Sequence, residues 1–169
     1  MLKLLPIALA VTLTGCGTEA PAPAEAEAAQ SLSAGLYELN AEVTAIHSTD
    51  QTTPATAMKV GDKGVTKACV LADGKPDPAL LAEAASDKCT IKNSYIRGGR
   101  MSAQMSCQRE GARGEVMPAM MGSFKSDSFE GEITTHTYFI ADGDYRLTRK
   151  ISAKRVGDCP AAGAEKAAS

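Results

Sequence analysis

Residues 89–107 read CTIKNSYIRGGRMSAQMSC and decide the fold, because two alternating segments flank a pair of glycines. In both segments most apolar residues occupy odd positions, and most polar residues occupy even positions. A period of two is typical of strands that bury one face. The residues expected to point inward are Cys89, Ile91, Tyr95, Met101, Ala103, Met105 and Cys107.

These two segments are predicted to form a hairpin. Opposed residues of an antiparallel pair share a face, so odd positions must pair with odd positions. The register that satisfies this condition has a three-residue loop, Arg97-Gly98-Gly99, in which Gly99 adopts the left-handed conformation. It places Ile91 opposite Met105, Tyr95 opposite Met101, and Cys89 opposite Cys107.

The N-terminus has the layout of a secretory leader: a positive Lys3, an apolar run over 4–13, and then small residues. Such a run is too short to remain as a membrane-spanning helix. Leu13-Thr14-Gly15-Cys16 resembles the lipobox of bacterial lipoproteins, which implies cleavage before Cys16 and attachment of acyl chains such as palmitate to its sulfur. The alternative is an ordinary leader that happens to contain a cysteine. Gly17 in place of an aspartate favours the outer membrane over the inner membrane.

The chain has five cysteines, and export assigns a role to each. Cys16 is the lipid acceptor, which leaves four thiols for an oxidising compartment, where two disulfides are expected. The hairpin register pairs Cys89 with Cys107, and by elimination Cys69 pairs with Cys159. A zinc site is the alternative, but no two of these cysteines have the short spacing of a zinc knuckle.

The remaining sequence predicts one domain at 35–159. Residues 1–15 are expected to be the signal peptide, 16–34 the lipidated cysteine and an Ala/Pro/Glu-rich tether, and 160–169 a disordered tail. We expect strands over 35–47, 112–124, 128–140 and 145–156, and an extended segment over 56–71. One short helix is predicted from the N-cap Asp77 and Pro78 to near Asp87. The fold class is therefore mainly β: an antiparallel meander of about seven strands, forming a curled sheet or partial barrel, with one short helix and two disulfides.

Asp142-Gly143 lies between two apolar runs and predicts a two-residue hairpin turn. With that turn His136 would lie opposite Arg149. The same register pairs Tyr145, Leu147 and Ile151 with Ile140, Tyr138 and Thr134.

Four pieces of this sequence resemble the bacterial family known as domain of unknown function 3617. They are 35–38 (GLYE), 87–89 (DKC), Cys107 and the ending 154–159 (KRVGDC). Tyr37 stands where the family commonly has Trp, and the Met content is lower than in many members. The resemblance implies an exported β-rich protein, often a lipoprotein, with no assigned activity, and it transfers no site residues.

The candidate sites each have a simpler structural interpretation. Met117, Met120 and Met121 are soft ligands suited to Cu(I), although Met also fills irregular cores. Asp142-Gly143-Asp144 could bind calcium but suits a turn. Arg109-Glu110 and Arg113-Glu115 are interpreted as a solvated charged connection.

The two histidines, His47 and His136, have no carboxylate or cysteine at metal-ligand spacing, so no metal site is expected there. No motif for nucleophilic catalysis or nucleotide binding is present in the sequence.

The preferred hypothesis is a non-enzymatic envelope lipoprotein, facing the periplasm, that binds a protein partner or an apolar small ligand on a curled sheet. No cofactor is expected, and a net charge of −2 gives no footprint for nucleic acid. A methionine-based periplasmic copper-binding module is the alternative. An enzyme would need a pocket that gathers His136, Arg149 and a carboxylate such as Glu132.

Overall fold

Seven antiparallel strands and one short helix make up residues 29–160, which are the residues that the computed structural model describes. The strands follow one another along the chain except where the helix lies between the second and third. The elements are β1 (Gly35–Ser48), β2 (Lys63–Val70), α1 (Pro78–Leu81), β3 (Asp87–Arg97), β4 (Arg100–Arg109), β5 (Gly114–Lys125), β6 (Ser128–Phe139) and β7 (Tyr145–Gly157).

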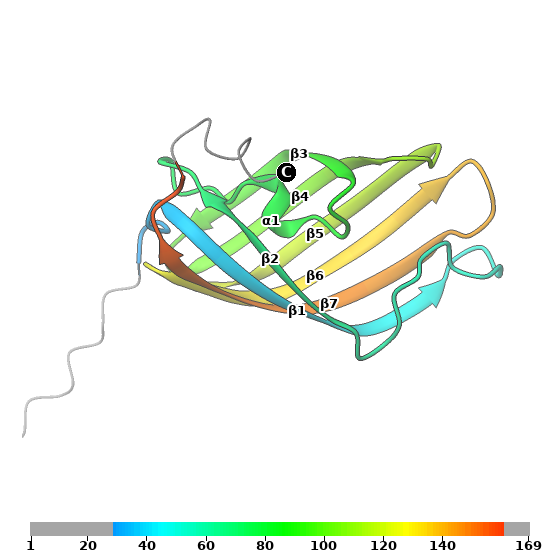
Figure 1. Cartoon of the computed structure of the whole chain (residues 1–169), viewed down its shortest axis with the longest axis horizontal. Coiled ribbons are helices and arrows are strands. Elements are labelled where there is room, and N and C mark those ends of the chain that lie inside the picture. The colour runs from blue at the N-terminus through cyan, green and yellow to red at the C-terminus, as the bar shows by residue number, and fades with distance from the viewer. Residues whose placement is uncertain (1–28, 161–169) are drawn as a thin grey trace, which may run out of the picture.

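All seven strands belong to one sheet, in the order β2-β1-β7-β6-β5-β4-β3. The sheet curls into a half-barrel, and α1 lies over its concave side (Figure 1). This confirms the predicted fold class. The expectations for the leader, the cleavage before Cys16, most of the tether and the tail concern residues 1–28 and 161–169, which lie outside the described residues.

The core fills the concave face. Its side chains come from the inward positions of every strand and from α1, with Tyr37 and Tyr145 the largest of the fully buried ones. Leu32 is also buried, although it precedes the predicted start of the domain. Within the described residues no helix is long and apolar enough to cross a membrane.

The β3–β4 hairpin confirms half of the predicted register. Cys89 lies opposite Cys107 and Ile91 opposite Met105, but a β-bulge at Lys92 then shifts the pairing by one residue. Tyr95 is consequently opposite Ser102 and points outward, so its predicted inward position is wrong. The predicted three-residue loop is also wrong, because Arg97 pairs with Arg100 and leaves only Gly98 and Gly99 in the turn. Both glycines have positive φ, as a tight two-residue hairpin turn requires.

The predicted register of the β6–β7 hairpin is wrong. Arg149 lies opposite Ile133, and His136 lies opposite Arg146. The connection is longer than two residues because the Asp144 carboxylate accepts a hydrogen bond from the backbone N–H of Phe139, at 2.7 Å. Ile140 therefore belongs to the loop, where it is exposed.

The helix is shorter than predicted. Asp77 caps it by accepting a hydrogen bond from the N–H of Ala79 (2.8 Å), as expected, but α1 ends at Leu81. The second strand is shorter too, because it begins at Lys63. Both predicted disulfides are present, Cys69–Cys159 and Cys89–Cys107.

A pair of glycines allows the sheet to bend. Gly122 of β5 lies directly opposite Gly131 of β6. A Cβ on Gly122 would lie 2.1 Å from the carbonyl oxygen of Glu130, and one on Gly131 would lie 2.2 Å from that of Met121. Only glycine permits so close an approach of two backbones, and glycine positions of this kind introduce curvature into sheets.

Candidate functional site

The concave face of the sheet is covered by the chain itself. Leu80 and Leu81 are buried, and α1 contacts both β2 and β3, the two edge strands. The segment around α1 thus bridges the two edges of the half-barrel. Where α1 lies, the curled face that we expected to accept a ligand is occupied by the protein's own side chains.

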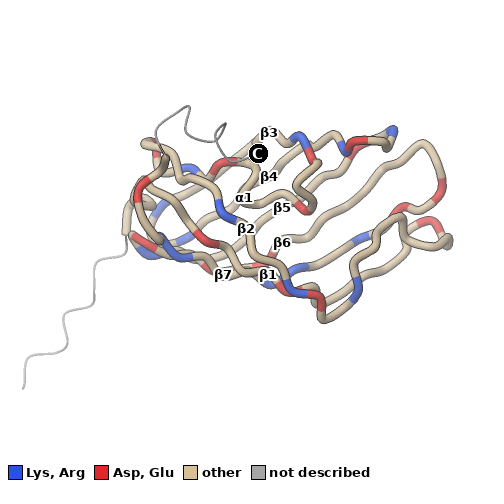
Figure 2. The backbone as a smooth tube through the Cα atoms, in the orientation of Figure 1, with Lys and Arg blue, Asp and Glu red and all other residues tan. Residues whose placement is uncertain are grey.

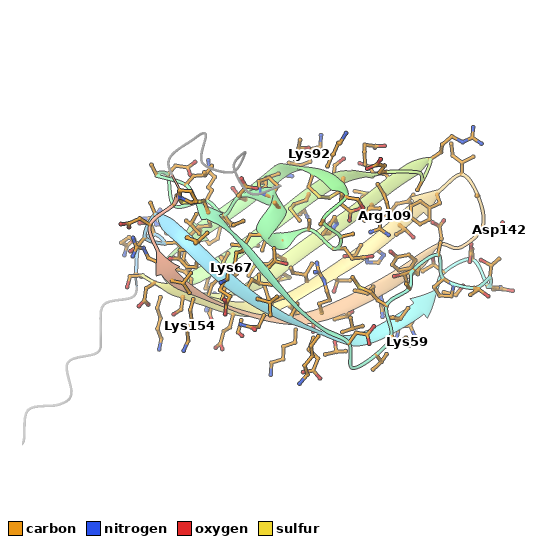
Figure 3. The ribbon with its side chains drawn as sticks, viewed as in Figure 1. Lys59, Lys67, Lys92, Arg109, Asp142 and Lys154 are labelled. Carbon is orange, nitrogen blue, oxygen red and sulfur yellow. A yellow bond between two sulfur atoms is a disulfide. The ribbon has the colours of Figure 1, made fainter. Side chains whose placement is uncertain are left out.

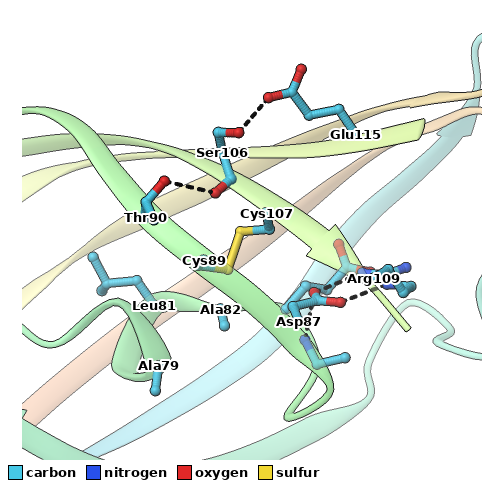
Figure 4. The surroundings of a disulfide bond; sticks show 12 residues. Ala79, Leu81, Ala82, Asp87, Cys89, Thr90, Ser106, Cys107, Arg109 and Glu115 are labelled. Carbon is cyan, nitrogen blue, oxygen red and sulfur yellow. Dashed lines mark hydrogen bonds and ion pairs between the residues drawn. A yellow bond between two sulfur atoms is a disulfide. The ribbon is translucent and has the colours of Figure 1, made fainter. Parts of the chain in front are cut away.

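A cluster of charged and polar side chains lies where this segment meets the sheet. Arg109 of β4 donates two hydrogen bonds to Asp87, at 2.8 and 2.9 Å (Figure 4). It also donates to Glu83 at 2.9 Å and to the Tyr145 hydroxyl at 2.7 Å. The prediction that Arg109 is solvated is therefore wrong, because its side chain is only 15% exposed.

The signal for this cluster is present in the sequence. Arg109 continues the odd-numbered phase of Met105 and Cys107, so the alternation that predicted the hairpin also turns Arg109 inward. Its hydrogen bonds with Asp87 raise its pKa above the ordinary arginine value. Burial, followed by the charge of Glu83, raises the pKa of Tyr145 to about 12. Tyr145 therefore stays protonated and donates a hydrogen bond to Glu83, at 2.5 Å.

A second buried arginine fixes the end of α1. Arg149 of β7 donates hydrogen bonds to the carbonyl oxygens of Leu81 (2.9 Å) and Ala82 (3.0 Å). These bonds satisfy carbonyls that a helix end leaves free. Burial lowers the pKa of Arg149. Among the described residues, the buried side-chain atoms without a hydrogen-bond partner are Oε2 of Glu83, Nε of Arg149 and Oγ1 of Thr135.

We interpret this cluster as a clamp. The clamp carries two charges of each sign and consists of Glu83, Asp87, Arg109 and Arg149. Most of the polar atoms of these side chains bind one another or the backbone. The clamp holds the segment of α1 against β4 and β7.

The three residues considered for an enzyme do not meet. Arg149 points to α1 on the concave side, whereas Glu132 and His136 alternate with the buried Ile133 and Thr135 and so point outward. His47 and His136 both lie opposite Arg146, from β1 and β6. No group of three His, Cys, Asp or Glu side chains in residues 29–160 is arranged to hold a metal ion.

The aspartates of the β6–β7 connection bind backbone. Asp50, from the loop after β1, accepts hydrogen bonds from the N–H groups of Gly143 (2.7 Å) and Asp144 (2.9 Å). Its bonds from Thr52 and Gly143 hold the pKa of its carboxyl well below the usual range. Asp142-Gly143-Asp144 is thus part of a loop, the interpretation preferred from the sequence.

The methionines proposed for copper lie on opposite faces of β5. Met120 is 1% exposed and belongs to the core, whereas Met121 is 72% exposed and Met117 40%. The three sulfurs therefore do not share one side of the sheet.

The outer, convex face of the sheet is divided into a charged half and an uncharged half. One row of opposed residues shows both halves: Lys63, Glu42, Lys150, Glu132, Met121, Ser102 and Tyr95. In this row the residues of β2, β1, β7 and β6 carry charges of alternating sign, and the residues of β5, β4 and β3 are uncharged. In Figure 2 the middle of β4 and of β5 is free of charged residues.

We call the outward residues of this region the uncharged surface. They are Asn93, Tyr95, Ser102, Gln104, Ser106, Met117, Ala119, Met121 and Ser123. Tyr95 is 55% exposed, and it lines a shallow groove together with Gln104, Ala119 and Met121. Sequence reasoning missed this surface because the bulge at Lys92 turns Tyr95 outward.

A comparison with known protein families identifies the family of this domain. A family model described as "Protein of unknown function (DUF3617)" matches residues 32–159, which is nearly the whole described domain. No curated protein and no solved structure matches the chain.

Proposed function

The chain belongs to the DUF3617 family, and from this premise we propose that it is a lipid-anchored envelope protein that binds a protein partner through the uncharged surface. The proposal has two parts, the anchor and the binding surface. Each part has its own support and its own test.

The anchor is supported by the use of the cysteines. The four cysteines of the described domain join in two disulfides, which form and persist in oxidising compartments. The fifth, Cys16, ends the lipobox-like Leu13-Thr14-Gly15-Cys16 behind an apolar run. A lipoprotein in the periplasm, held by acyl chains on Cys16, accounts for all five.

Action by binding is favoured over catalysis. The charged side chains of the clamp, Glu83, Asp87, Arg109 and Arg149, are engaged with one another and with the end of α1. A general acid or base must reach a substrate proton, and these groups are directed at partners within the protein.

The uncharged surface is the observation that carries the binding proposal. Centres of protein interfaces are depleted of charge and enriched in Tyr and Met. Tyr95, Met117 and Met121 are exposed among uncharged side chains, with Glu115 and Glu132 at the margin of the region, whereas the same face of β1, β2 and β7 is densely charged. A protein that contributes apolar side chains to the groove beside Tyr95 fits this composition.

The anchor is tested by intact-mass measurement of the protein purified from membranes. We expect a chain that begins at Cys16 and carries acyl chains, and a Cys16→Ser variant that is neither acylated nor cleaved there. A native chain that still begins at Met1, with Cys16 unmodified, contradicts the anchor.

The surface is tested by photo-crosslinking in the cell envelope. A photoreactive phenylalanine replaces Tyr95 in one variant and Asn40, an exposed residue of β1, in the matched control. We expect a discrete adduct with one protein from position 95 and none from position 40. The purified partner should then bind a Met121→Glu variant at least tenfold more weakly than the wild type.

Three outcomes overturn the binding proposal. They are no adduct from position 95, equal adducts from both positions, or an adduct with the mass of two copies of this chain. The last would assign the uncharged surface to self-association.

A further inference from the structure

The N-terminal segment enters the domain at one end of the half-barrel. The carbonyl oxygen of Ala29 accepts a hydrogen bond from the N–H of Gly99 (3.1 Å), and the N–H of Ser33 donates to the carbonyl of Ser126 (2.6 Å). Leu32, between them, is buried. The chain that comes from Cys16 is therefore fixed against the β3–β4 and β5–β6 turns.

Four exposed cations surround this entry point, and we call them the basic rim. Arg97 and Arg100 lie directly opposite each other at the Gly98–Gly99 turn, an arrangement in which like charges repel. Lys125 ends β5 beside that turn, and Lys154 of β7 lies opposite Ser128. None of the four forms an ion pair within residues 29–160.

The carboxylates near this end form no ion pairs with the four cations in the described residues. Asp73 pairs with Lys75, and Asp158 pairs with Arg155. Asp77 caps α1. Asp127 accepts a hydrogen bond from the Ser128 hydroxyl, at 3.4 Å. Asp77 and Asp127 keep their negative charge, Glu38 lies opposite Lys154 but pairs with Lys67, and Glu130 lines a groove with Lys125 and Lys154. The basic rim therefore presents a local excess of positive charge, which these carboxylates offset in part.

The opposite end of the molecule is acidic. Asp142, Asp144 and Asp50 gather there, in the loops after β6 and β1. Figure 3 shows Lys154 and Asp142 at the two extremes of the long axis. Lys59 and Arg146 also lie toward this end, so the contrast with the basic rim is one of local excess charge.

We propose that the basic rim rests on the anionic phospholipid headgroups of the membrane that holds the acyl chains of Cys16. This inference depends on the anchor proposed above. Cys16 precedes Ala29 by 13 positions, and a fully extended chain of that length spans about 45 Å, so the rim stays within reach of the headgroups. Each Lys or Arg close to an anionic surface strengthens its attraction roughly fivefold.

The arrangement would orient the domain. With the basic rim on the membrane, the strands run away from it and the acidic loops face the periplasm. The uncharged surface of β3, β4 and β5 then lies at the side of the domain, open to a partner.

The test uses the mature, acylated protein in lipid nanodiscs and measures how fast individual lysines are acetylated, with mass spectrometry as the readout. One set of nanodiscs contains phosphatidylcholine alone, and the other contains about one third phosphatidylglycerol. We expect Lys125 and Lys154 to react at least fivefold more slowly in the anionic nanodiscs, and Lys59 and Lys63, which lie farther along the strands, to react equally in both. High salt should abolish the difference, because it screens charge.

Charge reversal gives the matched controls. Arg97→Glu with Arg100→Glu should remove the protection of Lys125 and Lys154, whereas Lys88→Glu with Lys92→Glu, an equal change of charge on β3, should leave it intact. Both double variants alter exposed side chains, and their folding is checked by circular dichroism.

The possible failures are distinguishable. An acylated protein in which all lysines react alike in both nanodiscs overturns this inference alone. Equal protection of Lys125 and Lys154 by inorganic phosphate in uncharged nanodiscs also overturns it, because the rim would then be a site for a free anion. An intact mass without acyl chains overturns the anchor and, with it, this inference.

Discussion

Tyr145 of β7 connects the α1 segment with β4 beside the clamp. Its hydroxyl donates to Glu83 of the α1 segment and accepts from Arg109 of β4, while its backbone belongs to β7. A fully buried tyrosine needs a partner for its hydroxyl, and here both of the partners are charged. Such hydrogen bonds are stronger than those between neutral groups.

The raised pKa of Tyr145 predicts a loss of stability in alkali. An unfolded tyrosine ionises near pH 10, whereas Tyr145 in the folded protein has a pKa of about 12. The contribution of Tyr145 to the free energy of unfolding is complete below pH 10 and declines as the pH rises from 10 toward 12. The decline should reach about 2–3 kcal/mol, measured by urea unfolding at a series of pH values.

The matched comparison is Tyr145→Phe. This variant should be the less stable protein at pH 8, because it leaves Glu83 and Arg109 without the hydroxyl, and the gap should narrow above pH 10. Tyr37, whose pKa burial also raises, is present in both proteins and cancels. Tyr138→Phe, which changes an exposed tyrosine, should have the same free energy of unfolding as the wild type at every pH. Stability curves of Tyr145→Phe and wild type that stay parallel from pH 8 to 12 would contradict the assignment.

For single residues, the sequence predicted which side chains point inward but not which distant residues they contact. Alternation placed Met101, Met105 and Cys107 inward, and all three are buried. The same phase includes Arg109, but nothing local shows that Glu83 and Asp87 come to meet it. A charged side chain at an inward position is therefore interpreted as solvated, because its partners are distant in the sequence.

The strands and their turns were predicted where a local rule decides the geometry. The opposed Cys89 and Cys107 and a glycine turn between β3 and β4 follow from such rules, although the turn has two residues where three were predicted. The bulge at Lys92 does not follow from a local rule. The polar and apolar residues of β3 alternate in the same way with or without an extra residue, so the sequence does not show that Tyr95 points outward. Bulges and lysines on an edge also discourage pairing with other sheets.

The β6–β7 connection failed for a different reason. Asp-Gly is a strong signal for a two-residue turn, but Asp144 binds the N–H of Phe139 and Asp50 binds the N–H groups of Gly143 and Asp144. Asp50 lies in another loop, so the sequence around Asp142 contains no sign of it. A contact from elsewhere in the fold thus overrode the local preference.

The opposed glycines of β5 and β6 give a prediction for the sheet. Gly131→Ala should lower the free energy of unfolding by about 2–3 kcal/mol, because the new methyl group meets backbone, which cannot move aside as a side chain can. The matched control is Gly64→Ala in β2, where an added Cβ meets nothing within 4 Å. Urea unfolding of both variants measures the difference. Equal stabilities would show that the approach of β5 and β6 does not depend on glycine.

The whole molecule is an open sheet whose two edges are joined by other means. β2 and β3 are the edge strands, and the α1 segment bridges them. The Cys69–Cys159 disulfide fastens the end of β2 to the residues after β7. The number of strands, the hairpins from β3 to β7 and both disulfides were predictable, because each follows from alternation, turns or cysteine count. The pairing of β1 with β7, which leaves β2 and β3 at the edges, was not. The position of α1 over the concave face was not, since it depends on how far the sheet curls.

The two disulfides should differ in their contribution to stability. Cys69–Cys159 spans 90 residues, and Cys89–Cys107 spans 18. A cross-link restricts the unfolded chain more when its loop is longer, which gives about 4.6 kcal/mol for the first and about 3.2 kcal/mol for the second. Replacing both cysteines of a pair by serine, and measuring urea unfolding, tests this order.

The order would invert if folded-state contacts dominated over the entropy of the unfolded chain. Cys107 is fully buried, whereas Cys69 and Cys159 are only half-buried. Serine at 89 and 107 therefore adds the cost of placing a hydroxyl in the core, and alanine at these two positions removes that cost. If Cys69→Ala with Cys159→Ala is still the less costly pair of changes, the long loop is not what stabilises the half-barrel, and α1 with its clamp must hold the two edges together without the disulfide.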